Sequence, residues 1–323
     1  MGEAMIRSFL IYLSKAEWAK NLITNWKFAW KAASRFIAGE TIADAISVVK
    51  ELNGKGINAT LDQLGENTSS YQEAIQAADG IIKILDEIEK DGVKANVSIK
   101  LTQIGLALSE ELCSENLERI LGKAKEKNNF VRVDMEDTPY TDQTIELVKR
   151  MRQKGFLNTG IVLQSYLYRT ESDLEDLLKD NLKFRLVKGA YKEPSMVAYP
   201  KKKDVDDNFD KLAQIMMDGA IGNDPETISD NGRIPPVTAL GTHDEKRIVN
   251  AIEFQERIGL PKDSLEFQML YGIRRDLQEK LVNQGYPVRV YVPFGTHWYP
   301  YFVRRLAERP ANIWFFVSNY FKN

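Results

Sequence analysis

The segment VSIKLT, residues 97–102, decides the fold, because it alternates apolar and polar side chains within a run of β-forming residues. Further along the chain, the segment VRVDME, residues 131–136, repeats this alternation. Strands of a parallel sheet are buried on both faces and usually read as nearly continuous apolar runs. Polar side chains that recur on one face of such strands, among them Lys100 and Asp134, therefore need a structural or functional explanation.

From residue 58 onward, short β-rich runs alternate with amphipathic stretches, which is typical of repeated βα units. The predicted strands are Ala59–Leu64, Asn96–Thr102, Phe130–Glu136, Gly160–Tyr166, Phe184–Ala190, Val237–His243, Leu265–Leu270 and Val288–Pro293. Eight strands, each followed by a helix, over about 250 residues match a closed (βα)8 barrel of the TIM type. A doubly wound open sheet is the alternative.

Two segments flank the predicted barrel, which covers residues 58–309. Residues 1–57 are rich in helix formers, contain Trp18, Trp26 and Trp30, and break near Gly39, so they predict an N-terminal arm of two helices. Residues 310–323 are expected to form a C-terminal helix. Inside the barrel region, the polar and proline-containing connection 219–236 is predicted to be a surface excursion.

Composition excludes several classes of function. The 323 residues carry 44 basic and 46 acidic side chains, so no broad charge is available to hold nucleic acid or an anionic bilayer. A single cysteine and two histidines cannot build a Cys/His zinc site; a carboxylate metal site remains open, but no metal-ligating residue is predicted. The sequence shows neither an apolar run of about 18 to 20 residues nor a signal-peptide pattern, so a cytoplasmic location is expected.

The polar residues of the predicted strands indicate a functional lumen. Burial of Lys100, Asp134 and Arg185 costs several kcal/mol each unless these charges are paired or bind a ligand. Active sites of such barrels lie at the C-terminal ends of the strands, which is where most of these residues fall. Any one of them has a simple alternative reading as a structural ion pair, but their joint occurrence favours an active site.

Eight motifs support a more specific interpretation. They are Ser98–Gln103, Val133–Asp137, Leu163–Tyr166, Arg185–Tyr191, Gly241–Asp244, Phe267–Gly272, Tyr291–Pro293 and Arg304–Glu308. In this order and spacing, the chain from about residue 58 to 310 resembles the proline dehydrogenase family, which also occurs as a domain of the bifunctional enzyme proline utilisation A. The resemblance implies oxidation of L-proline to Δ1-pyrroline-5-carboxylate, the first step of proline catabolism to glutamate.

The resemblance also implies a noncovalently bound FAD, in a chain that lacks both the G-x-G-x-x-G turn and a P-loop. The residues that it places around the flavin are Asp134, Met135, Gln164, Arg185, Val187, Lys188, Gly189, Ala190, Thr242 and His243. Small residues such as Gly189 and Ala190 allow the backbone to approach a ring closely. Lys203 corresponds to a basic residue near the pyrophosphate, although a solvated charge run is the alternative for this lysine.

The substrate pocket implied by the resemblance is built from charged and aromatic side chains. Its members are Lys100, Tyr271, Tyr291, Arg304, Arg305 and Glu308, with Leu270 as an apolar wall and Glu66 as a gate that pairs with Arg304. Two guanidiniums and an ammonium can fix a small carboxylate electrostatically. Asp134, Arg185 and Tyr271 are the expected catalytic residues; Asp134 is expected to orient its neighbours, and Arg185 to stabilise charge on the reduced flavin.

The resemblance further implies that a membrane quinone accepts the electrons, so peripheral contact with the inner face of the membrane is expected. The Trp314–Phe316 patch and the aromatic N-terminal arm are candidates for this contact, but packing on the barrel is the favoured role for both. Transient contact with pyrroline-5-carboxylate dehydrogenase is also expected. Two rival functions remain open at this point. One is an aldolase-like barrel with a Schiff base on Lys100 or Lys188, and the other is a catalytically silent ligand-binding barrel.

Overall fold

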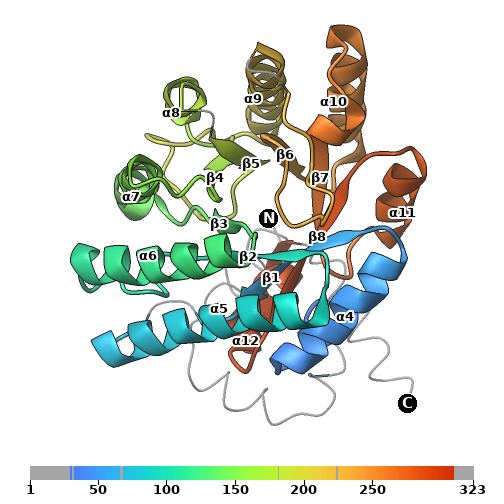
Figure 1. Ribbon diagram of the computed structural model, residues 1–323. Coiled ribbons are helices and arrows are strands. Elements are labelled where there is room, and N and C mark those ends of the chain that lie inside the picture. The colour runs from blue at the N-terminus through green and yellow to red at the C-terminus, as the bar shows by residue number, and fades with distance from the viewer. Residues whose placement is uncertain (1–29, 31–32, 66–67, 181, 223–224, 309–323) are drawn as a thin grey trace, which may run out of the picture.

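Eight parallel strands close into a barrel in the order β1 to β8, with β8 paired to β1 (Figure 1). The computed structural model describes residues 30, 33–65, 68–180, 182–222 and 225–308, with the side chains of residues 307 and 308 left out. Helices surround the strands on the outside, as a (βα)8 barrel requires (Figure 1). Closure confirms the predicted fold class and excludes the open sheet.

Several strands end earlier than the sequence predicts. The strands are β1 (Asn58–Gln63), β2 (Ala95–Ile99), β3 (Val131–Val133), β4 (Thr159–Gln164), β5 (Lys183–Val187), β6 (Thr238–Gly241), β7 (Leu265–Leu270) and β8 (Val288–Phe294). The predictions that β2 to β6 continue to Thr102, Glu136, Tyr166, Ala190 and His243 were wrong at these ends. After β2 and β3, the backbone N and the hydroxyl of Thr102 donate to the Glu136 carboxylate, and the backbone leaves the strand ladder as a loop.

The helices follow the strands in alternation. They are α4 (Ile42–Gly54), α5 (Tyr71–Asp91), α6 (Glu110–Glu126), α7 (Thr141–Gln153), α8 (Thr170–Leu178), α9 (Lys202–Gly222), α10 (Glu245–Ile258), α11 (Arg275–Asn283) and α12 (Trp298–Glu308), with short 3-10 turns η1 (Thr138–Tyr140) and η2 (Lys262–Ser264). Side-chain caps define several starts: Ser70 accepts a hydrogen bond from Glu73 N, and Ser109 from Leu112 N. Left-handed glycines end α5 and α10.

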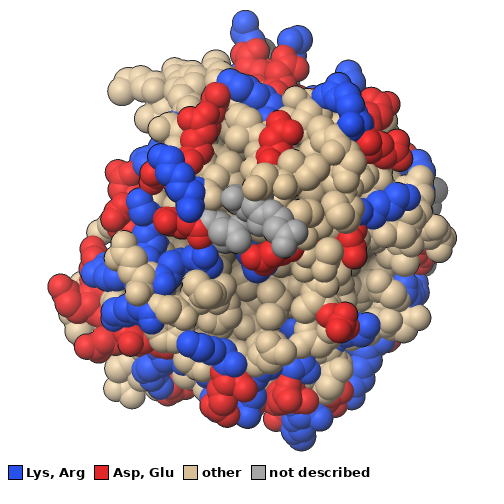
Figure 2. Space-filling view, turned by 45° about the horizontal axis from the view of Figure 1, so that its top comes forward, with Lys and Arg blue, Asp and Glu red and all other residues tan. Residues whose placement is uncertain are grey.

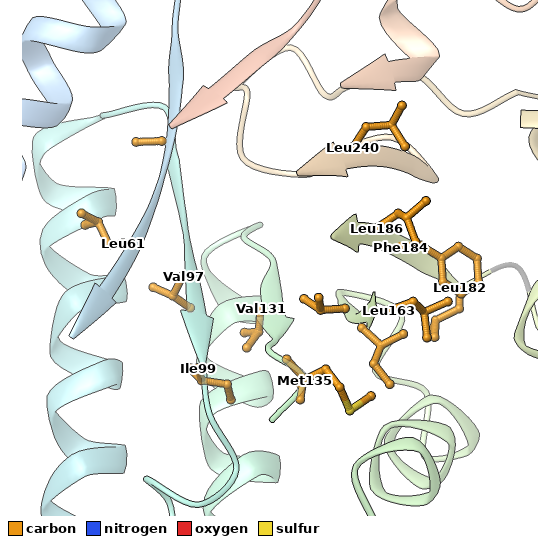
Figure 3. Close-up of a cluster of buried hydrophobic side chains, with 14 of the residues drawn as sticks. Leu61, Val97, Ile99, Val131, Met135, Leu163, Leu182, Phe184, Leu186 and Leu240 are labelled. Carbon is orange, nitrogen blue, oxygen red and sulfur yellow. The ribbon is translucent and has the colours of Figure 1, made fainter. Parts of the chain in front are cut away.

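The main hydrophobic core lies between the outer face of the barrel and the helices. Leu61, Val97 and Phe184 are almost fully buried in it. Figure 3 shows apolar side chains of this layer from β1 to β6 and from the connections beside them. Because side chains alternate across a strand, an apolar outer face leaves the polar residues of the same strands for the lumen. The alternation seen in the sequence therefore corresponds to a barrel with an apolar outer face and a polar lumen.

The connection 219–236 corrects one prediction, because its second half is not a surface excursion. Helix α9 continues to Gly222, and the chain then returns beneath the barrel, where Arg233 is only 7% exposed. Arg233 pairs with Glu89 and donates to the carbonyl oxygen of Val93 at 3.2 Å. The carbonyl oxygen of Gly232 accepts from Arg289 inside the lumen at 2.8 Å. This segment covers the polar N-terminal end of the barrel, which would otherwise open to water.

A second, smaller hydrophobic cluster joins the N-terminal segment to α12. It contains Ala33, Ile37, Trp298 and Phe302, and the ring of Trp30 lies 5.3 Å from that of Trp298. Most of the predicted first helix of the arm and the whole predicted helix 310–323 lie outside the described residues, so the domain boundaries remain predictions. Within the described part of the chain, none of the helices combines the length and apolarity that a membrane crossing requires.

Figure 2 shows charged side chains of both signs mainly toward the edge of one face of the molecule, and uncharged residues over much of its middle. Lysine and arginine alternate with aspartate and glutamate there, and no large region carries a single sign. Exposed charged side chains pair with one another at the surface of the protein, as Lys154 does with Glu118. This distribution agrees with the formal net charge of −2.

Candidate active site

Asp134, directly after β3, is the centre of a polar network in the lumen. Its carboxylate pairs with Arg185 of β5 and accepts hydrogen bonds from Ser98 Oγ at 2.6 Å and from the Tyr291 hydroxyl at 2.9 Å. The guanidinium of Arg185 also lies over the ring of Tyr291, 5.3 Å from its centroid. Three strands, β2, β5 and β8, thus supply groups that meet at the carboxylate that follows β3.

Lys100 follows β2 and lies beside this centre. Its Nζ is 3.4 Å from both carboxylate oxygens of Asp62, 3.5 Å from Asp134 Oδ2 and 3.3 Å from the Tyr291 hydroxyl. Asp62, at the end of β1, is 1% exposed. Two carboxylates therefore face the two cations Lys100 and Arg185, and the described lumen cluster is balanced in charge.

The electrostatics of the cluster fix its protonation. Burial acts to raise the pKa of Asp134, but the neighbouring charges of Arg185 and Lys100 outweigh it and hold this pKa below its ordinary value. Burial, assisted by the negative charges of Asp134 and Asp62, raises the pKa of Tyr291 well above its ordinary value. At neutral pH, Asp134 is therefore ionised and the Tyr291 phenol keeps the proton that it donates to Asp134.

A second layer of polar residues lies deeper in the lumen. Arg185 Nη1 donates to Gln268 Oε1 at 3.3 Å, and Gln268 Nε2 donates to Glu266 Oε1 at 2.5 Å. Glu266 in turn forms an ion pair with Arg289 through two bonds of 2.9 Å, and the two side chains are 0% and 1% exposed. The network therefore runs without a break from Asp134 to the closed N-terminal end of the barrel.

Two of the residues predicted to contact flavin, Gln164 and Gly189, lie at the C-terminal ends of β4 and β5. Gln164 is 3% exposed, and its Oε1 has no hydrogen-bond partner among the described residues. Gly189 adopts a φ of +114°, and a Cβ at this position would collide with the ring of Tyr166. A glycine is therefore required for the backbone to pass this close to an aromatic ring. The buried, unsatisfied amide oxygen is available to a ligand.

The other predicted flavin contacts have protein partners. Lys188 Nζ lies between Asp206 and Asp244, 2.7 Å from Asp244 Oδ2, and His243 Nε2 accepts a bond of 2.9 Å from Leu270 N. Thr242 is buried and its Oγ1 accepts from Asp244 N. Of the remaining predicted contacts, Met135 lies in the main hydrophobic core, Val187 packs against that core, and Ala190 is exposed.

Some predicted residues are not brought into the cluster. The Tyr271 side chain lines a different cavity of about 420 Å³ together with Trp30 and Gly39, although its backbone N donates to Tyr291 O at 2.9 Å. The side chain of Lys203 is 82% exposed and pairs with Asp207. Leu270, by contrast, is paired in register with Tyr291 and is half-buried. The geometry thus gives Tyr271 and Lys203 no place in the lumen cluster.

Helix α12 carries the two predicted substrate arginines. Arg304 and Arg305 are both half-buried, and the Arg305 guanidinium lies 5.1 Å from the ring centroid of Tyr301. The helix packs against Leu64, immediately after β1, so it lies at the C-terminal end of the barrel. The proposed gate residue Glu66 and the side chain of Glu308 lie outside the described residues.

The prediction from sequence missed several members of the network. Asp62, Ser98 and Gln268 bond directly to predicted residues, Glu266 bonds to Gln268, and none of the four was assigned a role. Strand parity was the available signal, because Asp62 and Ser98 occupy lumen-facing positions of their strands just as Lys100 does. Among the residues that the structure describes, no group of three or more histidine, cysteine, aspartate or glutamate side chains could hold a metal ion.

Comparisons with known proteins agree with this geometry. The family model described as "Proline dehydrogenase" matches residues 45–317. Proline dehydrogenase 1 of Bacillus subtilis (strain 168) is 40% identical over 323 residues, which cover 98% of this chain and all of that protein. Proline dehydrogenase 2 of the same organism is 38% identical over 309 residues, 96% of each chain. The proline dehydrogenase of Deinococcus radiodurans is 43% identical over 299 residues, 91% of each chain.

Solved structures resemble the barrel as well. Proline utilization A from Bdellovibrio bacteriovorus, inactivated by N-propargylglycine, matches with a TM-score of 0.77 and 26% identity over 87% of this chain and 33% of that chain. Proline utilization A from Bradyrhizobium japonicum matches with a TM-score of 0.70 and 21% identity, which supports the fold alone. The similarity covers the barrel and a minor part of these longer proteins.

Proposed function

The chain belongs to the proline dehydrogenase family and oxidises proline to Δ1-pyrroline-5-carboxylate, and from this premise we propose that the cluster around Asp134 is its active site and that FAD is its cofactor. The observation that carries the proposal is the charge-balanced network of Asp62, Lys100, Asp134 and Arg185 at the C-terminal ends of the strands. Barrel enzymes place their chemistry at this end. A network of this kind holds its side chains in fixed positions without a large net charge.

The residues around Gln164 fit a flavin. Its buried amide oxygen has no partner in the described part of the chain and can accept a hydrogen bond from a ring N–H. The missing side chain at Gly189 lets the ring of Tyr166 pack directly against the backbone beside it. Bound FAD would supply the hydride acceptor, which no side chain can provide. Arg185, held by Asp134 and Ser98, would direct a fixed positive charge toward the cofactor.

The substrate carboxylate needs cations beyond those of the lumen cluster. The charges of Lys100 and Arg185 are already balanced by Asp62 and Asp134, so these cations alone offer little net attraction. We therefore assign the carboxylate to Arg304 and Arg305 of α12, with Lys100 as an additional donor. Leu270 and Tyr291, which are paired across β7 and β8, would contact the ring of the substrate.

Asp134 orients this site instead of removing a proton. Its carboxylate accepts from Arg185, Ser98 and Tyr291, and its depressed pKa makes it a weak base. Deprotonation of the substrate amine before hydride transfer is left to solvent. The role of Asp134 is therefore to hold the Tyr291 hydroxyl and the two cations in place.

We further propose that a quinone reoxidises the cofactor, during peripheral contact with the inner face of the membrane. Such an acceptor is required because the reaction leaves two electrons on the protein. A transient complex with pyrroline-5-carboxylate dehydrogenase would take up the product. A soluble quinone analogue, but not a nicotinamide cofactor, should restore the oxidised absorption spectrum of the substrate-reduced enzyme.

The deciding experiment is an anaerobic absorption spectrum before and after addition of L-proline. A protein that carries oxidised FAD should lose its flavin band with L-proline and not with a nicotinamide cofactor. A colourless protein that cannot be reconstituted with FAD would contradict the assignment of the cofactor. A yellow protein that proline does not bleach would instead be a silent flavin-binding barrel.

The aldolase-like alternative has a separate test and a structural argument against it. A lysine must be neutral to form a Schiff base, but Lys100 lies beside Asp62 and Lys188 lies between Asp206 and Asp244. Neighbouring carboxylates favour the charged ammonium. Borohydride trapping of a carbonyl compound on the protein, without flavin colour, would nevertheless establish that chemistry.

A further inference from the structure

We propose that Gln268 of β7 is a positioning residue that sets the orientation of the Arg185 guanidinium. The inference rests on the proposed role of Arg185 beside the flavin. Gln268 is 5% exposed and contacts Arg185 through its amide oxygen and Glu266 through its amide nitrogen. It therefore joins the active-site layer of the lumen to the ion pair below it.

The direction of the Gln268 amide is determined by Glu266. A carboxylate paired with an arginine can only accept hydrogen bonds, so the NH2 group of Gln268 must face Glu266 Oε1, 2.5 Å away. The amide oxygen is then left to face Arg185 Nη1 at 3.3 Å. The reversed amide would place oxygen against a carboxylate and NH2 against a guanidinium, which are two repulsive contacts.

Glu266 can act in this way because it is held firmly. Arg289 forms two bonds of 2.9 Å to it and donates to the carbonyl oxygens of Ala59 and Gly232, both at 2.8 Å. These backbone groups belong to β1 and to the segment that covers the N-terminal end of the barrel. The orientation of Gln268 is thus determined by the closed end of the fold.

Gln268 affects the active site through its contact with the Arg185 guanidinium. Its Nη2 bonds to Asp134 and to Ser98 Oγ, while its Nη1 bonds to Gln268. Gln268 therefore pulls one side of the guanidinium away from Asp134. Without this acceptor, we expect the guanidinium to turn toward the carboxylate, where its charge is more fully neutralised. Reduced flavin would lose part of its electrostatic stabilisation.

The test is Gln268→Met, with Gln278→Met as the matched control. Gln278 is also buried, at 2% exposure, but it donates to the carbonyl oxygen of Ile273 on the outside of the barrel. Gln268→Met should leave FAD content and KM for proline near wild type and lower kcat about tenfold. The midpoint potential of bound FAD should fall by about 30 mV, the equivalent of tenfold for a two-electron couple. The control should change neither quantity.

A conservative variant separates positioning from simple packing. In Gln268→Glu, two carboxylates share one site, so one of them retains a proton. A protonated Glu side chain can donate to Glu266 and accept from Arg185, as glutamine does, and the potential should return to within about 10 mV of wild type. A packing role would instead make both variants less stable and leave the potential unchanged.

The outcomes are distinguishable. Unchanged potential and kcat in folded Gln268→Met protein would overturn the inference, while the proposed function would stand. Absence of FAD from the wild-type protein would contradict the proposed function itself. If Gln268→Met does not fold, Gln268→Asn serves in its place, because it keeps a polar amide but is one methylene shorter and withdraws the acceptor from Arg185 Nη1. A potential equal to that of wild type in this variant would also overturn the inference.

Discussion

Replacement of Asp134 tests the centre of the lumen network. Asp134→Asn keeps the shape of the side chain but removes its charge and one of its two acceptor oxygens. The carboxylate of the native residue serves Arg185, Ser98 and Tyr291 and lies 3.5 Å from Lys100 Nζ. The variant leaves Asp62 as the remaining described carboxylate beside two buried cations.

The expected loss of stability in Asp134→Asn can be estimated from the distance between Asp134 and Lys100. At 3.5 Å, the attraction between Asp134 and Lys100 is about 5 kcal/mol for an effective dielectric constant of about 20. Because the variant no longer buries a charged carboxylate, part of this lost attraction is offset by the desolvation cost that disappears. Breaking a buried pair costs about 3 to 5 kcal/mol. Because asparagine can still accept one hydrogen bond, we expect a loss of about 3 kcal/mol in the free energy of unfolding and about 10²-fold in kcat for proline.

Urea unfolding of the variant, followed by circular dichroism, measures this loss. The matched control is Asp79→Asn, because Asp79 forms an ion pair with Arg119 in which both side chains are about half exposed (56% and 44%). Exposed pairs contribute about 0 to 1 kcal/mol. If Asp134→Asn is no less stable than the control, the network does not hold the lumen together and the reasoning fails.

The pH dependence gives a second check on the same variant. The pKa of Asp134 is lowered in the folded protein, so its contribution to stability is complete above the unfolded pKa of about 3.9 and disappears as the pH falls through the folded pKa. The stability difference between wild type and Asp134→Asn should therefore be constant from about pH 5 to pH 9. A difference that grows steadily over this range would show that another group titrates.

Three further predictions concern the substrate and cofactor ends of the site. Tyr291→Phe should change the ratio of catalytic efficiencies for proline and hydroxyproline by about 1 to 3 kcal/mol without loss of FAD, and an unchanged ratio would remove its hydroxyl from substrate discrimination. Arg304→Met or Arg305→Met should lower kcat/KM for proline about 10²-fold or more at normal flavin content, and wild-type kinetics in both variants would assign these arginines to another role. Gly189→Ala should reduce FAD content per chain, because its φ of +114° strains an alanine and the new Cβ would collide with Tyr166; full occupancy would show that this backbone can move.

The sequence predicted the strand pattern well because that pattern is local. Alternation within each run depends on neighbours two residues apart, and eight runs separated by helices fit one closed barrel. The ends of the strands were harder to predict. Thr102 and Glu136 continue the alternation of β2 and β3, but they bond to each other through side chains, so the ladder ends before them. The sequence pattern alone does not distinguish a residue that is hydrogen-bonded within the sheet from one that lies just beyond the end of its strand.

Tyr271 and Tyr291 illustrate the limit for the site. Both belong to motifs of the family, and both were predicted to line the substrate pocket. In the sheet, Tyr291 is paired with Leu270, the last residue of β7, so Tyr271 lies one position beyond the strand and its side chain takes the opposite face. A register shift of one residue reverses the side to which a residue points, and register is a property of the paired strands.

The sequence by itself determined the barrel, the polar character of its lumen and the family to which the chain belongs. Which of the polar residues meet was decided by the tertiary structure alone. Arg185 reaches Asp134 across 51 residues of sequence and Gln268 across 83, and Lys100 reaches Tyr291 across 191. Such contacts exist only after closure, when β8 pairs with β1 and distant strand ends share one dry interior. In that interior each buried charge must find a partner, because unpaired burial costs several kcal/mol.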